Sequence, residues 1–99
     1  MTRGKEAQLQ DRFCKWLRGQ GCKVFKQQMN ATTRAGTPDV FAFKAGLWIW
    51  IEFKKSKNAK KRPGQQENIN WAKENSFGYF VYPENEKEVK KELKEILRD

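Results

Sequence analysis

The sequence contains no histidine among its 99 residues. Catalytic triads that use imidazole as their base are therefore excluded, and so are zinc sites that need a histidine ligand. Only two cysteines are present, Cys14 and Cys22, and their spacing does not form the C-x-x-C pair of a redox or zinc motif. We interpret both as packing residues with reduced thiols, which is typical of a cytoplasmic chain.

Long apolar segments are also missing from the chain. The longest apolar run is Leu47–Ile51, whereas a membrane-spanning helix needs about 20 apolar residues. The first six residues lack the apolar stretch of a secretory signal. We therefore expect residues 1–99 to form a single domain with no membrane partner.

Acidic residues are few relative to basic ones: the chain has 12 Asp and Glu and 21 Lys and Arg. The net charge is therefore +9 and the pI is near 9.8. Such an excess favours a polyanionic partner, most commonly nucleic acid, over a soluble protein that is merely basic. The positive charge is densest in the polar loop 54–62. The candidate phosphate contacts are Lys55, Lys57, Lys60, Lys61 and Arg62, with Arg34 as a weaker one. The alternative is a solvated, charged loop.

Hydrophobic periodicity predicts the order α-β-β-β-α-β-α. Helical spacing indicates helices near residues 3–19 and 65–75 and a last helix that starts at Asn85, which forms a capping box with Glu88. Strands are expected over 22–26, 39–43, 47–53 and 79–82. The four tryptophans lie within these elements, so we expect them in the core. The pattern is that of a layered α/β structure.

Two motifs carry the chemistry of the chain. Gly36-Thr37-Pro38-Asp39 precedes the second predicted strand, and Glu52-Phe53-Lys54 ends the third. In an antiparallel hairpin those ends are adjacent, so the Asp39 and Glu52 carboxylates, with the Phe53 carbonyl oxygen, can bind a hard cation such as Mg²⁺. Lys54 shares a strand face with Glu52 and can hold water or neutralise a phosphate. Taken separately, the motifs also fit a Pro-Asp turn and an exposed ion pair.

Glu6 is oddly placed on the first predicted helix. At 100° per residue it falls within the arc of the apolar residues Leu9, Phe13 and Leu17. A carboxylate on that stripe needs a partner, and Glu6 could complete a metal sphere directly or through water. Equally, it could lie in the solvated first turn and complement the helix dipole.

These motifs make the chain resemble the virus-type replication-repair nuclease (VRR-NUC) family of the PD-(D/E)xK superfamily, in its small stand-alone bacteriophage form. Glu6 matches that family's glutamate on the first helix, Gly36–Asp39 its G-x-P-D, and Glu52–Lys54 its E-x-K. The family also has a glutamine that opens the helix after the basic loop. Gln65 is the better match here, and Gln66 is the alternative.

The resemblance implies a restriction-endonuclease-like α/β fold, with an αβββαβ core, a mixed central sheet and here an extra C-terminal helix. It implies dependence on Mg²⁺ or Mn²⁺, and cleavage by a homodimer of branched DNA such as Holliday junctions, in the host cytoplasm if the chain is phage-encoded. The catalytic residues would be Glu6, Asp39, Glu52, Lys54 and Gln65. Lys54 would orient or deprotonate the attacking water, and the products would carry 5′-phosphates.

Other functions fit parts of the pattern. A DNA-binding module with a decayed active site would keep the basic loop, and a sequence-specific restriction-type endonuclease would keep the motifs. The latter needs additional loops to read base edges, for which 99 residues leave little room. RNA is a further substrate that the pattern accommodates. Symmetric cutting of two strands also favours a homodimer, with Phe77–Tyr82 or the last helix as candidate interfaces.

Overall fold

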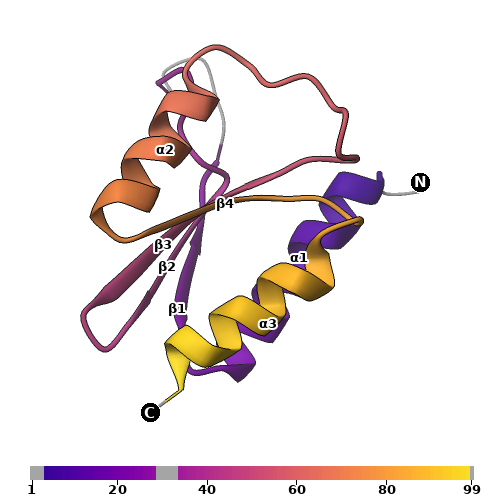
Figure 1. Ribbon diagram of the computed structural model, residues 1–99. Helices are drawn as coiled ribbons and strands as arrows, with labels where there is room; N and C mark the ends of the chain where they lie inside the picture. The colour runs from indigo at the N-terminus through magenta and orange to yellow at the C-terminus, as the bar shows by residue number, and fades with distance from the viewer. Residues whose placement is uncertain (1–3, 29–33, 99) are drawn as a thin grey trace.

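The computed structural model describes residues 4–28 and 34–98. Its elements, in chain order, are α1 (Lys5–Gly19), β1 (Lys23–Lys26), β2 (Val40–Lys44), β3 (Leu47–Phe53), α2 (Gln65–Asn75), β4 (Phe77–Val81) and α3 (Glu86–Leu97) (Figure 1). The predicted order is confirmed, although β4 begins two residues earlier than expected and β2 begins after Asp39. Nowhere in the described ranges is a helix long and apolar enough to cross a membrane.

The four strands form one mixed sheet in the order β1-β2-β3-β4. Both β1–β2 and β2–β3 pair antiparallel, whereas β3 and β4 run parallel. In the β2–β3 register Val40 lies opposite Ile51. Asp39 therefore lies just outside the ladder, beside the end of β3, which is where Glu52 and Lys54 are found.

Helices α1 and α3 lie together on one face of the sheet, as Figure 1 shows. Leu9, Phe13 and Leu17 of α1 are fully buried there, as are Ile49 and Ile51 of β3. Both cysteines belong to this core, which confirms their expected packing role. A bidentate contact between Arg12 and Glu86 joins the two helices at the surface. Because every second residue of β3 points to this face, the alternate residues point to the opposite one.

Helix α2 covers part of the opposite face, over β3 and β4 (Figure 1). It approaches so closely at Gly78 that a Cβ atom there would lie 2.6 Å from the Ile69 carbonyl oxygen. The expectation that all four tryptophans belong to the core is wrong for this face, because Trp71 of α2 is 49% exposed. Trp48 and Trp50 of β3 are only partly buried.

The start of α3 differs from the predicted capping box. Asn85 occupies the N-cap position, but its side chain makes no capping hydrogen bond. Its Oδ1 accepts from the Tyr82 backbone N–H at 2.9 Å, and its Nδ2 donates to the Phe80 carbonyl at 2.9 Å. The side chain thus closes the turn between β4 and α3, and this use competes with capping.

Candidate active site

Asp39 is held at the end of the sheet by two hydrogen bonds. Its carboxylate Oδ2 accepts from the Phe53 backbone N–H at 2.8 Å, and its carbonyl oxygen accepts from the Gln27 N–H at 2.8 Å. The N–H and C=O of one strand residue point to the same neighbouring strand, so the Phe53 carbonyl is directed to the Asp39 side as well. The G-x-P-D and E-x-K motifs therefore meet through Phe53.

Gly36 of the G-x-P-D motif allows the loop that carries Asp39 to approach α2 closely. Gly36 has φ = +83°, which favours glycine, and a Cβ atom there would lie 2.7 Å from the Gly64 carbonyl carbon. Gly64, just before α2, has a positive φ as well, at +84°. The Asn68 side chain of α2 donates to the Gly36 carbonyl at 2.7 Å. The loop that carries Asp39 thus packs directly on the first turn of α2, and the part that Asn68 plays in this contact leaves no signal in the sequence.

Gln65 links the carboxylate of Glu52, near the end of β3, to the ammonium of Lys54, the residue directly after β3. Its Nε2 donates to Glu52 Oε2 at 2.6 Å, and its Oε1 accepts from Lys54 Nζ at 2.6 Å. The Arg62 backbone N–H donates to the same Oε1 at 2.8 Å. Gln66 lies outside this network, is exposed and bonds to Asn70. Of the two candidate glutamines, the structure therefore brings Gln65 to the carboxylates.

Lys54 is buried, with only 8% of its surface exposed. Its ammonium donates to Gln65 Oε1 and, at 3.3 Å, to the Lys60 carbonyl oxygen. A lysine ammonium has three N–H donors. Among the described residues two are used, so one remains for a water molecule or a phosphate oxygen.

The carboxylates of Asp39 and Glu52 repel each other. Burial, and then the nearby charge of Asp39, raise the pKa of Glu52 to about 8. Burial also raises the pKa of Asp39 above its usual range, against the lowering effect of the hydrogen bond from Phe53. Glu52 Oε1 is buried and has no hydrogen-bond partner in the described part of the chain. Such a pair is expected to be costly unless a proton or a cation neutralises it.

The same observations fit a divalent metal. Two carboxylates and a carbonyl are hard oxygen ligands, and the orphaned Glu52 Oε1 is free to be one of them. Residues 4–28 and 34–98 contain no cluster of three or more acidic, cysteine or histidine side chains that could enclose an ion. Protein sites typically hold Mg²⁺ through one or two carboxylates, with water and substrate phosphate filling the other positions.

Glu6 is the predicted site residue on α1. It is exposed in the first turn of α1, where an acidic residue complements the helix dipole. No hydrogen bond or ion pair within the described ranges links it to Asp39 or Glu52. The structure thus places it in the solvated turn, and a contribution through water stays a prediction.

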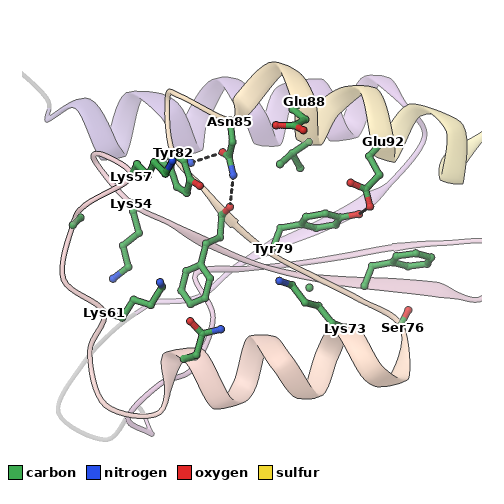
Figure 2. A pocket seen from close by; sticks show the side chains of 16 residues that line it. Lys54, Lys57, Lys61, Lys73, Ser76, Tyr79, Tyr82, Asn85, Glu88 and Glu92 are labelled. Atoms are coloured by element: carbon green, nitrogen blue, oxygen red, sulfur yellow. Dashed lines mark hydrogen bonds between the residues drawn. The ribbon is translucent and has the colours of Figure 1, made fainter.

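The basic loop lies next to the site. Lys55, Lys57, Lys60, Lys61 and Arg62 are all exposed, and Arg34 is exposed before the Gly36 turn. Beside β4, between α2 and α3, runs a groove of about 760 Å³. Figure 2 shows Lys54, Lys57 and Lys61 at one end of it. Lys54 therefore belongs both to this groove and to the hydrogen-bond network that reaches Glu52.

One solved structure, described as a VRR_NUC domain, superposes on this chain with a TM-score of 0.65 and 25% sequence identity. The match covers 81% of this chain and 85% of that chain. No protein-family model and no curated protein matches the sequence. The shared fold and its coverage agree with the two motifs that meet at the end of β3, and they support membership of this chain in the VRR-NUC family.

Proposed function

We propose that residues 1–99 form one nuclease domain that hydrolyses phosphodiester bonds of DNA with Mg²⁺ or Mn²⁺, preferentially in branched DNA such as Holliday junctions. The observation that carries this proposal is the coupled Asp39–Glu52 pair: Glu52 Oε1 has no hydrogen-bond partner in the described part of the chain, and Gln65 joins Glu52 Oε2 to the Lys54 ammonium. The setting is a nuclease fold on a chain with net charge +9.

Each residue has a distinct task in the proposed site. Asp39, Glu52 and the Phe53 carbonyl hold the metal, which when bound neutralises charge on the substrate phosphate. Lys54 directs its remaining N–H at the attacking water or at the phosphate oxygen, where negative charge develops. Gln65 fixes the direction of Lys54 and of Glu52 at once. In-line attack then forms a bond from the water oxygen to phosphorus and breaks the P–O3′ bond; the water gives up a proton, the leaving 3′-oxygen takes one up, and the products are a 5′-phosphate and a 3′-hydroxyl.

Recognition of the substrate rests on shape and backbone charge. The proposed DNA contacts are Arg34, Lys55, Lys57, Lys60, Lys61 and Arg62, all of them exposed. They suit phosphates, because a flexible lysine contacts backbone charge more readily than it reads a base edge. Symmetric cutting of a junction calls for two active sites, so we propose a homodimer that acts in the cytoplasm.

Cleavage of labelled four-way junction, flap and linear duplex DNA with Mg²⁺ or Mn²⁺ tests the proposal. We expect paired cuts in the junction, abolished by Asp39→Ala and retained by Asp11→Ala, which removes a half-buried carboxylate of α1 that pairs with Lys26. Full activity of the Asp39→Ala protein would refute the assigned site. Salt-sensitive binding without cleavage in either metal would instead identify a DNA-binding module.

A further inference from the structure

The start of α2 contacts both motifs of the candidate site through two side chains that lie three residues apart. Gln65 binds Glu52, near the end of β3, and Lys54, directly after it. Asn68 donates from its Nδ2 to the Gly36 carbonyl oxygen at 2.7 Å. Residues i and i+3 of a helix lie on the same side. One side of α2 therefore meets the E-x-K segment and the G-x-P-D segment, and the proposed function assigns a task to Gln65 alone.

The contact between Asn68 and the G-x-P-D loop is tight. A Cβ atom at Gly36 would lie 3.0 Å from Asn68 Nδ2 and 2.7 Å from the Gly64 carbonyl carbon. A Cβ atom at Gly64 would in turn lie 3.5 Å from the Gly36 Cα atom. The loop and the start of α2 are thus in backbone-to-backbone contact, and the hydrogen bond from the half-buried Asn68 fixes their relative position.

The chain between Gly36 and Asp39 is short and stiff. The backbone N–H of Thr37 and its Oγ1 both donate to the Arg34 carbonyl oxygen, at 3.2 and 2.6 Å, which closes a turn. Pro38 is buried, its ring fixes its own φ, and it also restricts the residue before it. Few torsions are therefore free between the two ends, so the position of the Gly36 carbonyl determines where the Asp39 backbone lies.

We propose that Asn68 is a positioning residue of the metal site: by holding the Gly36 carbonyl it keeps the Asp39 carboxylate beside Glu52, where both can bind one divalent cation. The Phe53 N–H, which donates to Asp39 Oδ2 at 2.8 Å, sets the direction of that carboxylate. Asn68 sets the position of the backbone that carries it, and so acts through Gly36 rather than on the cation. The inference rests on the proposed function in taking Asp39 and Glu52 as metal ligands.

Two other roles for Asn68 fit the structure less well. A helix cap satisfies a free N–H group before the first turn is complete. Asn68 already lies within α2, where its own N–H donates to the Gly64 carbonyl oxygen at 3.0 Å. A phosphate contact needs an exposed donor, whereas Asn68 is half-buried and directs its Nδ2 at Gly36.

Binding of Mn²⁺ to the protein without DNA, measured from the electron paramagnetic resonance signal of the free ion, tests this role. We expect Asn68→Ala and Asn68→Leu each to raise the dissociation constant for Mn²⁺ at least about tenfold, as residues that orient metal ligands typically do when removed. Leucine resembles asparagine in shape but cannot donate, so it keeps the packing if the alanine variant fails to fold. Circular dichroism establishes which variants are folded.

Asn75→Ala is the matched control for these variants. The Asn75 side chain is also an amide on α2 that donates to a backbone carbonyl oxygen, that of Trp71 at 2.9 Å, but it lies at the other end of the helix. Its removal deletes the same kind of hydrogen bond away from both motifs. We therefore expect Asn75→Ala to bind Mn²⁺ with wild-type affinity.

The metal dependence of DNA cleavage separates positioning from ligation. Asn68→Ala leaves both carboxylates in the chain, so saturating Mn²⁺ should restore its cleavage rate to within about threefold of the wild type. Asp39→Ala removes a ligand and should stay inactive at every Mn²⁺ concentration. A cleavage rate of Asn68→Ala that stays low at saturating Mn²⁺, with unchanged Mn²⁺ affinity, would overturn the inference.

The wild type distinguishes failure of this inference from failure of the proposed function. If the wild type binds Mn²⁺ and cuts DNA, but a folded Asn68 variant binds Mn²⁺ equally well, Asn68 only stabilises the fold, and the inference alone is refuted. A wild type that neither binds Mn²⁺ nor cuts DNA would refute the proposed function and, with it, the role of Asn68.

Discussion

Glu52→Gln should stabilise the metal-free protein, although it removes a proposed metal ligand. The glutamine keeps a carbonyl oxygen to accept the 2.6 Å hydrogen bond from Gln65 Nε2. It removes a buried negative charge that faces Asp39, and its amide can donate toward that carboxylate. Replacing one of two like charges in a low-dielectric site by a neutral isostere therefore relieves repulsion.

The magnitude follows from the pKa of Glu52, which burial and the charge of Asp39 raise from 4.5 to about 8. A raised carboxyl pKa means that folding favours the protonated form. The stability is therefore fully present below pH 4.5 and is lost as the pH rises toward 8. One pH unit corresponds to about 1.4 kcal/mol, so the loss between pH 5 and pH 9 is roughly 4 kcal/mol. That is a large share of the 5–15 kcal/mol typical of a domain.

Urea unfolding in EDTA, followed by tryptophan fluorescence, measures this difference. We expect Glu52→Gln to match the wild type within about 1 kcal/mol at pH 5 and to exceed it by at least about 2 kcal/mol at pH 9. Glu74→Gln, an exposed change near the end of α2, is the control and should show no such trend. Mg²⁺ should raise the stability of the wild type and leave that of Glu52→Gln nearly unchanged. A stability gain that is absent or independent of pH would refute the reasoning, because the two carboxyl groups would then not be coupled.

Three further outcomes follow from the site. Gly36→Ala should cost at least about 2 kcal/mol in urea unfolding and reduce cleavage, because its Cβ would overlap the backbone before α2 at 2.7 Å; a neutral result would show that this contact is loose. Gln65→Ala should lower the cleavage rate about a hundredfold by releasing Glu52 and Lys54, whereas the neighbouring Gln66→Ala should retain full activity; equal losses would remove the basis for distinguishing them. Lys55→Ala and Lys60→Ala should each lower the slope of log K against log salt by about 0.9 in duplex binding, with the cleavage rate at saturating DNA unchanged; unchanged slopes would show that the loop does not contact phosphate.

Much of the site could be predicted because its parts are close along a hairpin. The strand alternation places Glu52 and Lys54 on one face, and the antiparallel β2–β3 pairing places Asp39 beside them. The structure brings these three side chains together as expected. Glu6 could not be placed in the same way, since nothing local fixes how the first turn of α1 meets the sheet.

The choice between Gln65 and Gln66 shows the limit of local reasoning. Adjacent residues on a helix point about 100° apart. Which of them faces the carboxylates depends on how α2 docks, and the close approach at Gly78 and the Gly36–Gly64 contact set that docking. Both contacts join segments far apart in the sequence, so neither leaves a periodic signal.

The order of the elements, the paired motifs and the basic loop follow from the sequence alone, because periodicity and hairpin geometry are local. Contacts between distant segments fix which face of the sheet α2 covers and how much of it. That docking buries Gln65 against Glu52 and leaves Trp71 and Phe43 exposed. Apolar residues occur on both faces of a central strand, so their pattern cannot reveal which of them a single short helix leaves open.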